Sequence, residues 1–450
     1  MDEKIVSGPV RRQVGLARRY PEHRMRCNQW GALALLATAA ATWGAAGDLP
    51  PQVLLLARFK QKIRQDLSRI VNYTCLETIE RSARIPPADS FQAGDTVRLE
   101  VSTVRGKELF AWPGAHHFED KDVAFFVTGG VIANGVFALL AHNLFSSDNI
   151  AFQYGGEESP DGRRAVRYDY RLPQFLSKFK IRVGNTSAVV AAKGSFWFDP
   201  VSLDLLRLDV YGDQLPAAVD LAEVLIRIYY ARENIGASSA LLPERSEVVL
   251  THLSGEAYRN AIQFSRCREY QSESTISFDA PAEPRTELPK PQARVVDLPA
   301  GVLVPVMLET AIDSRTASVG DLLHARVWRD VRHNGSLLLP KGAAIRGRLL
   351  RLDRRSSPEP YFVVGIEFSA VEWENARAEF AGELTECGKM EIAGSHPRGV
   401  GIFFARGSRL RITSGLHMVW RTLGPATSSG ASARSTGGRG SAATGLIGRF

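Results

Sequence analysis

The chain has 450 residues, of which 44% are hydrophobic and 23% charged, a composition typical of a soluble globular protein with two or three domains. Its formal net charge is +8, but residues 1–26 hold seven basic and three acidic side chains and carry +4 of that excess. The remaining charge shows no concentrated basic patch, and this excludes a nucleic-acid partner.

The first predicted element is a secretory signal. Residues 25–47 combine two flanking arginines, an apolar run of leucine and alanine, and the small residues Gly44 and Ala46 at positions suited to cleavage. We assign residues 1–46 to a leader and signal peptide, with an uncleaved membrane anchor or a buried helix as alternatives. No later stretch is apolar enough to span a membrane. The sequence therefore predicts a periplasmic or otherwise extracytoplasmic protein of the bacterial cell envelope.

An amphipathic helix follows Pro50 and Pro51. Its apolar residues recur at helical spacing and form one stripe, with Arg58, Lys62, Gln65, Asp66 and Arg69 lying mostly away from it. The residues on the stripe are Leu56, Phe59, Ile63, Leu67 and Ile70.

The pattern then changes to period two. Val97, Leu99 and Val101 alternate with polar residues, several similar runs follow, and Asp199–Pro200 predicts a hairpin turn between two of them. One further helix is expected in GVFALLAHNLF. Residues 51–278 are thus predicted to form a mainly β domain, a large antiparallel curled sheet of eight or more strands with a few helices against it.

Cys267 stands in an unusual setting. Read as a strand, its segment places Cys267 with Ser265 and Glu269 on the polar face, so packing does not explain it. Export permits disulfides, and we predict a Cys75–Cys267 bridge. Two reduced thiols are an alternative, and so is a reactive Cys267 activated by the arginines on either side. The last cysteine, Cys387, is then expected to be free.

The rest of the chain divides by composition. Residues 279–294 form a proline-rich linker, and residues 295–422 form a second, small β-barrel domain with turns at Asn334–Gly335 and at the Pro-Lys-Gly step that follows. Residues 423–450 are mostly Gly, Ser, Ala and Thr, which predicts a disordered tail.

Catalytic and metal-binding motifs are missing from the sequence. The histidines His116 and His117 lie beside three acidic residues, but neighbouring residues of a strand point to opposite faces, so we interpret this cluster as a polar loop. We expect no catalytic residue, no metal, no cofactor and no enzymatic activity.

The predicted strands offer apolar and aromatic area instead. Phe196 and Phe198 share one face with Trp197 opposite, and Leu206 and Leu208 share a face of the next strand. These side chains line either an ordinary core or a cavity for an apolar ligand. The candidate ligand-binding residues are Phe152, Tyr154, Tyr168, Tyr170, Phe196, Phe198, Leu206 and Leu208.

Two family resemblances follow from these residues. The segment GSFWFDPVSLDLLRLDVYG, together with export, the first helix and the long sheet, resembles the LolA-like superfamily, the outer-membrane lipoprotein carriers and their relatives. That resemblance implies an incomplete barrel plugged by helices, which holds lipid or the acyl chains of a lipoprotein. The segments AGVLVPVMLETAIDS and NGSLLLPKGAAIRGRL resemble the periplasmic β-barrel of VirB10/TrbI-type secretion components.

The sequence therefore predicts an exported envelope protein without catalytic function, whose half-barrel binds an apolar ligand or a partner protein. Lipid, lipoprotein and other envelope proteins are the expected partners. The alternative is a structural or assembly component of an envelope or secretion complex, in which both barrels are packed and hold no ligand.

Overall fold

The computed structural model describes residues 49–70, 73–104, 107–115, 118, 123–126, 136–183, 186–269, 294–355, 359–394 and 397–424. The predicted signal peptide, the polar loop around His116, most of the linker and nearly all of the tail lie outside these ranges. No helix in the described ranges is long and apolar enough to cross a membrane.

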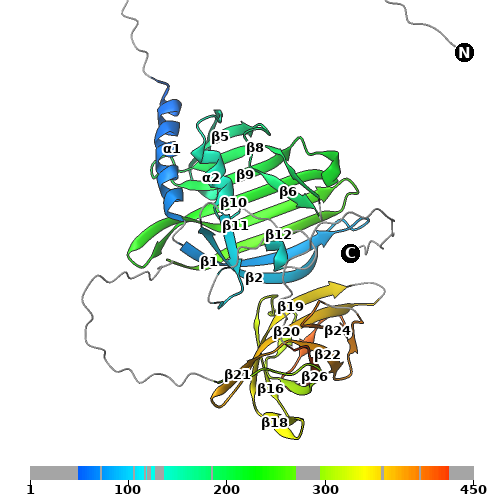
Figure 1. Cartoon of the computed structure of the whole chain (residues 1–450). Coiled ribbons are helices and arrows are strands. Elements are labelled where there is room, and N and C mark those ends of the chain that lie inside the picture. Colours follow the sequence, from blue (N-terminus) through cyan, green and yellow to red (C-terminus); the bar gives the residue numbers. More distant parts are fainter. Residues whose placement is uncertain are drawn as a thin grey trace, which may run out of the picture. The chain divides into compact units, whose positions relative to one another are not determined.

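Ten strands form one antiparallel sheet in the order β3-β2-β1-β12-β11-β10-β9-β8-β5-β4 (Figure 1). This large curled sheet confirms the predicted fold class. A separate hairpin consists of β6 (Lys180–Val183) and β7 (Thr186–Val189). The strands of the large sheet are β1 (Tyr73–Arg84), β2 (Gln92–Val104), β3 (Lys107–Ala111), β4 (Phe152–Glu158), β5 (Ala165–Leu172), β8 (Ala191–Phe198), β9 (Leu205–Asp213), β10 (Leu221–Ile235), β11 (Ser238–His252) and β12 (Ala257–Glu269).

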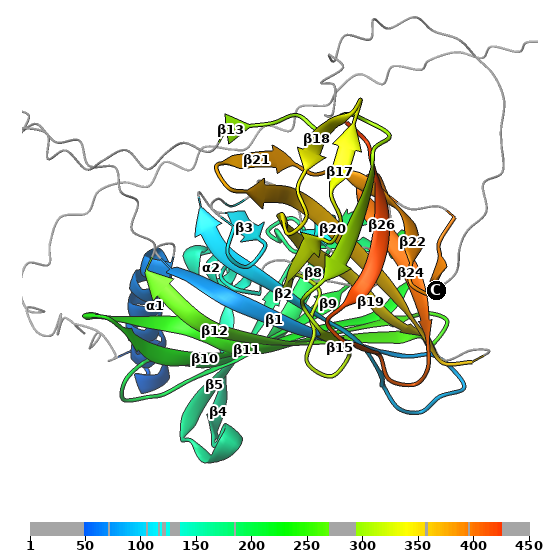
Figure 2. The same cartoon turned by 90° about the horizontal axis from the view of Figure 1, so that it is seen from below.

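Two helices, α1 (Pro51–Arg69) and α2 (Leu139–Ser146), pack on one face of this sheet (Figures 1 and 2). We call this face the helix face and the opposite one the open face. Proline at the first position of α1 has no N–H to leave unpaired, so it suits a helix start. The predicted stripe of α1 is buried at Phe59, Ile63 and Leu67, which confirms the amphipathic helix.

The Asp199–Pro200 step forms the tight connection between β8 and β9. The carboxylate of Asp199 accepts hydrogen bonds from the backbone N–H groups of Val201 (2.8 Å) and Ser202 (2.9 Å). Asparagine and aspartate commonly close turns in this way. The turn confirms the predicted hairpin.

A disulfide joins Cys75 of β1 to Cys267 of β12. Thr74 pairs with Arg268 and Leu76 with Ser265, so Cys75 faces two residues of β12 instead of one. The extra residue of this β-bulge shifts the alternation, and Cys267 packs against the core rather than beside Ser265. The prediction that Cys267 lies on the polar face is therefore wrong.

A second sheet has the order β13-β21-β20-β19-β16-β14-β26-β22, and β24 continues it by pairing with β20 and β23. Gly401 of β24 lies against Leu384 of β22 and Trp420 of β26, where a Cβ atom would come within 2.6 Å of both side chains. Glycine therefore lets the two ends of the sheet approach each other closely. The strands are β13 (Arg294–Val295), β14 (Leu303–Leu308), β16 (Leu322–Val327), β19 (Ala344–Arg355), β20 (Tyr361–Trp373), β21 (Ala376–Glu379), β22 (Gly382–Cys387), β23 (Glu391–Ile392), β24 (Val400–Arg406) and β26 (Leu416–Thr422).

Two small hairpin-like pairs complete this part of the chain. β15 (Ile312–Asp313) pairs with β25 (Arg411–Ile412), and β17 (Val331–His333) pairs with β18 (Ser336–Leu339). Asn334 and Gly335, which connect β17 to β18, both have positive φ, as the predicted Asn-Gly turn requires.

Candidate functional site

The helix face carries an aromatic cluster around Phe59 of α1. The ring of Phe59 stacks on Phe198 with 4.1 Å between centroids and on Phe196 with 5.3 Å, and it meets Phe145 of α2 edge-on at 5.4 Å. Phe152 adds an edge contact to Phe196 at 5.3 Å. We call Phe59, Phe145, Phe152, Phe196 and Phe198 the aromatic cluster. It is continuous with the core of the sheet.

Most of the predicted ligand-binding residues thus lie together on the helix face. Tyr168 and Tyr170 are buried there, and their hydroxyls donate to the backbone oxygens of Gln52 (2.5 Å) and Asp209 (3.0 Å). Burial and the neighbouring Tyr154 raise the pKa of Tyr168 to about 12. Tyr154 itself is 43% exposed and forms the rim beside Tyr168.

Leu206 is the exception among these residues. Phe198 pairs with Leu205 and Trp197 with Arg207, so Leu206 is the additional residue of a bulge. Leu208 joins the core of the helix face, whereas Leu206 packs with Trp197 in a separate small cluster. The expectation that Leu206 and Leu208 share a face is wrong.

Ion pairs hold the C-terminal half of α1 at the edge of the aromatic cluster. Lys62 contacts Asp66 (2.7 Å) and Asp204 (2.6 Å), and Arg232 contacts Asp66 (2.8 Å) and Asp204 (2.6 Å). Burial of Asp204 opposes its ionisation, but hydrogen bonds from Arg232 and Lys62 outweigh it and lower the pKa of this carboxyl. We call these four residues the α1 ion-pair network. Asp66, expected away from the buried stripe, is buried because the network surrounds it.

Two buried carboxyls occupy another part of the helix face. Glu108 accepts hydrogen bonds from the N–H groups of Phe137 (3.1 Å) and Ala138 (2.9 Å), immediately before α2. Burial, reinforced by the charge of Glu108, raises the pKa of Glu77 well above its ordinary value. Among the described residues, Glu77 Oε2 and the hydroxyl of Tyr230 have no hydrogen-bond partner.

The open face carries two rows of polar side chains that run across the strands. Members of a row are cross-strand neighbours on β5, β8, β9, β10, β11, β12, β1 and β2, in that order. The first, which we call the basic row, consists of Arg167, Trp197, Arg207, Tyr229, Arg245, Gln263, Thr78 and Arg98. The second, which we call the acidic row, consists of Asp169, Ser195, Asp209, Arg227, Glu247, Ala261, Glu80 and Thr96.

Cations and aromatic rings alternate in the basic row. The guanidinium of Arg207 lies 4.5 Å from the ring centroid of Trp197 and 5.6 Å from that of Tyr229, and Arg245 stacks on Tyr229 at 3.6 Å. Arg207 also donates to Asp209 of the acidic row at 2.7 Å. Such cation–π contacts stabilise neighbouring strands and hold the guanidinium groups flat.

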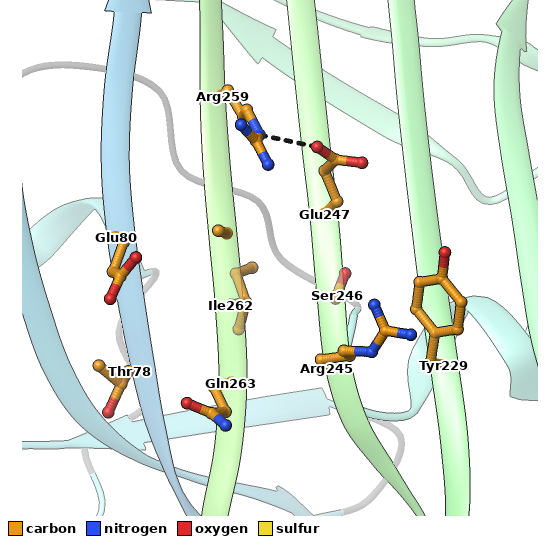
Figure 3. Close-up of a pocket in the computed structure, with 10 residues that line it drawn as sticks. Thr78, Glu80, Tyr229, Arg245, Ser246, Glu247, Arg259, Ile262 and Gln263 are labelled. Atoms are coloured by element: carbon orange, nitrogen blue, oxygen red, sulfur yellow. Dashed lines mark ion pairs between the residues drawn. The ribbon is translucent and has the colours of Figure 1, made fainter. Parts of the chain in front are cut away.

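A hollow of about 270 Å³ opens between these rows, and Figure 3 shows most of the side chains that line it. Ala261 lies between Glu247 and Glu80 in the acidic row, and its short side chain leaves room among longer ones. Glu247 is paired with Arg259 (2.7 Å) and Arg227 (3.2 Å). The charges around the hollow therefore largely compensate one another, and this favours a role in holding the sheet together.

Sequence reasoning missed both rows. Basic and aromatic residues recur at outward positions of successive strands, but their alignment depends on the strand register. Within the described ranges, no three His, Cys, Asp or Glu side chains are grouped so that they could hold a metal ion.

No protein-family model and no curated protein matches the chain. Two solved structures are similar to part of it. One is a DUF1329 family protein from Desulfovibrio piger, with 13% identity and a TM-score of 0.27 over 49% of this chain and 94% of that chain. The other is described as an outer membrane lipoprotein-sorting protein domain from Vibrio parahaemolyticus, with 11% identity and a TM-score of 0.26 over 49% of this chain and 93% of that chain. The description of the fold rests on the strand order and packing of this chain.

Proposed function

We propose that this protein is an extracytoplasmic, non-enzymatic envelope protein that binds an apolar ligand on the helix face of its first sheet. The ligand class is a lipid or the acyl chain of a lipoprotein. The observation that carries the proposal is the aromatic cluster, in which one amphipathic helix covers the stacked rings of Phe196 and Phe198. An acyl chain needs this kind of wide apolar surface.

Location outside the cytoplasm is supported by the Cys75–Cys267 disulfide. Disulfides form and persist in oxidising compartments and are rare in the cytosol. The bridge joins β1 to β12 in the sheet that would hold the ligand. Export and the integrity of the binding sheet are therefore linked.

Binding requires that α1 move. A ligand that contacts Phe196 and Phe198 has to take the place of the Phe59 ring, so α1 acts as an exchangeable cover. The α1 ion-pair network holds this cover closed, and its half-exposed pairs with Asp204 can be replaced by water when the helix leaves. The measured affinity is then reduced by the fraction of molecules in which the face is open.

The test is ligand binding by the oxidised full chain. Lipid is extracted from the purified protein and identified by mass spectrometry, and a fluorescent fatty acid is titrated into wild type and Asp204→Asn. Loss of two half-buried ion pairs favours opening by about 1.4 kcal/mol, so the variant is expected to bind about tenfold more tightly. Asp353→Asn is the matched control, because Asp353 also pairs with two arginines but lies in β19. The carrier proposal fails if no lipid co-purifies and neither wild type nor Asp204→Asn binds the probe.

A structural or assembly function is the second candidate. The close stacking of Phe59 on Phe198 favours it, because the helix face is filled by the protein's own side chains. In that case α1 is a permanent part of the core. The Asp204→Asn variant would then lose stability without gaining any affinity for the fatty acid.

A further inference from the structure

The second sheet carries a groove that is independent of the helix face. It lies between the turn that leads into β23, the end of β24 and the segment from Arg409 to Leu416, and its volume is about 830 Å³. This size is within the range of small-molecule binding pockets. We call it the β24 groove.

The floor of the groove is apolar. Met390, Phe404 and Leu416 line it with half-buried side chains, and Leu410 and Ile412 are buried beneath. These residues come from separate strands and turns, so the apolar surface is a product of the fold rather than of one hydrophobic run in the sequence.

The rim is basic and its charges are uncompensated. Four basic residues line the groove against a single acidic one, Glu391. Arg409 pairs with Asp313 at 2.7 Å. Within the described residues, the exposed side chains of Lys389, Arg406 and Arg411 have no carboxylate partner, in contrast to the hollow on the open face.

We propose that the β24 groove binds an anionic phospholipid presented by a membrane. Unpaired cations above an apolar floor complement an anionic headgroup attached to an acyl chain, since the headgroup meets the rim and the first part of the chain meets the floor. A free inorganic anion would use the rim alone, and an acidic peptide would leave its polar backbone against the apolar floor. The second sheet thereby attaches the protein to an anionic membrane surface while the first sheet handles its own ligand.

The test is co-flotation of the oxidised full chain with vesicles of phosphatidylcholine alone or mixed with phosphatidylglycerol. We expect binding only to the anionic vesicles. The double variant Arg406→Glu/Arg411→Glu is expected to lose at least about 30-fold in partitioning, because each basic residue at such a surface contributes about a factor of five. Circular dichroism and cooperative unfolding establish that each variant is folded.

The matched control is Lys341→Glu/Arg294→Glu. It makes the same change in charge at exposed side chains of the second sheet that lie outside the groove. Equal losses in the two double variants would reduce the effect to net charge and overturn the proposal, and so would equal binding of wild type to both kinds of vesicle.

A competition experiment separates the lipid from other anions. Short-chain phosphatidylglycerol is expected to displace the vesicles at far lower concentrations than glycerol phosphate. If glycerol phosphate competes equally well, the groove is a site for the free headgroup and the floor plays no part. If polyglutamate binds and vesicles do not, the groove docks an acidic protein segment, and the proposal is wrong.

Discussion

The ring of Phe59 in α1 stacks on the ring of Phe198 in β8, with 4.1 Å between centroids and 14° between planes. Both side chains are fully buried. The contact joins the first helix of the described chain to the middle of the sheet. It therefore determines both how firmly α1 covers the helix face and how much room an apolar ligand would have there.

The first prediction concerns this contact. Phe59→Ala is expected to lower the free energy of unfolding by about 3–5 kcal/mol, because it removes a buried ring from a packed aromatic cluster. Phe59→Leu keeps much of the volume and is expected to cost less. Urea unfolding of the oxidised protein measures both. Leu54→Ala, at an exposed position of the same helix, is the control and should change stability by less than about 0.5 kcal/mol. A Phe59→Ala protein as stable as wild type would mean that α1 is not part of the cooperative core.

The second prediction concerns the disulfide. Cys75 and Cys267 are 192 residues apart, so their bridge restricts a long stretch of the unfolded chain. Replacing both by alanine is expected to lower the free energy of unfolding by about 2–5 kcal/mol. Cys387→Ala serves as a control for the loss of a buried thiol, and it should leave the effect of reductant on wild-type stability unchanged.

Thiol counting gives an independent measurement of the same bridge. In a chain that lacks residues 1–46, denaturation without reductant should expose one alkylatable cysteine, Cys387, and denaturation with reductant should expose three. Intact mass after alkylation distinguishes these states. Three modified cysteines without reductant would contradict the disulfide and the oxidising compartment that it supports.

The sequence predicted the features that depend on neighbouring residues. The stripe of α1 follows from helical spacing, the strands follow from alternation, and the turns at Asp199 and Asn334 follow from local backbone preferences. The candidate residues Phe196 and Phe198 were placed on one face with Trp197 opposite, as the structure has them. Each of these inferences needs only a few consecutive residues.

The errors arose where one residue interrupts the alternation or where a distant partner decides. A bulge moves Cys267 to the core, and another moves Leu206 away from Leu208. Asp66 reads as a polar residue of α1, but its partner Arg232 lies on β10, and no local pattern reveals that pairing. The two rows of the open face depend on the register of eight strands, which alternation alone leaves undetermined.

The third prediction tests the basic row. Tyr229 lies between Arg207 and Arg245, so Tyr229→Leu removes two cation–π contacts and is expected to lower the free energy of unfolding by about 1–2 kcal/mol. Tyr229→Phe keeps the ring and should remain within about 0.5 kcal/mol of wild type. Urea unfolding in parallel compares the two variants. Equal losses in both would show that the hydroxyl, and not the stacked ring, is what the row requires.

The last prediction concerns Glu77, whose pKa in the folded protein is raised by burial and by the charge of Glu108 above the ordinary value of 4.5. Between the unfolded and folded pKa values, the folded state holds a proton that the unfolded state has released. Stability is therefore fully present below the unfolded pKa, falls by about 1.4 kcal/mol per pH unit as the pH rises above it, and stops falling once the folded pKa is passed. Glu77→Gln keeps the size of the side chain and removes the titration. The variant should show a flatter profile of unfolding free energy against pH above about 4.5 and should be more stable than wild type at neutral pH. Glu80→Gln, at an exposed position of the same strand, is the control and should retain the wild-type slope. Parallel profiles for wild type and Glu77→Gln would show that Glu77 ionises within the folded protein without cost, so that the interior beside Glu108 and Tyr230 would have to be accessible to water.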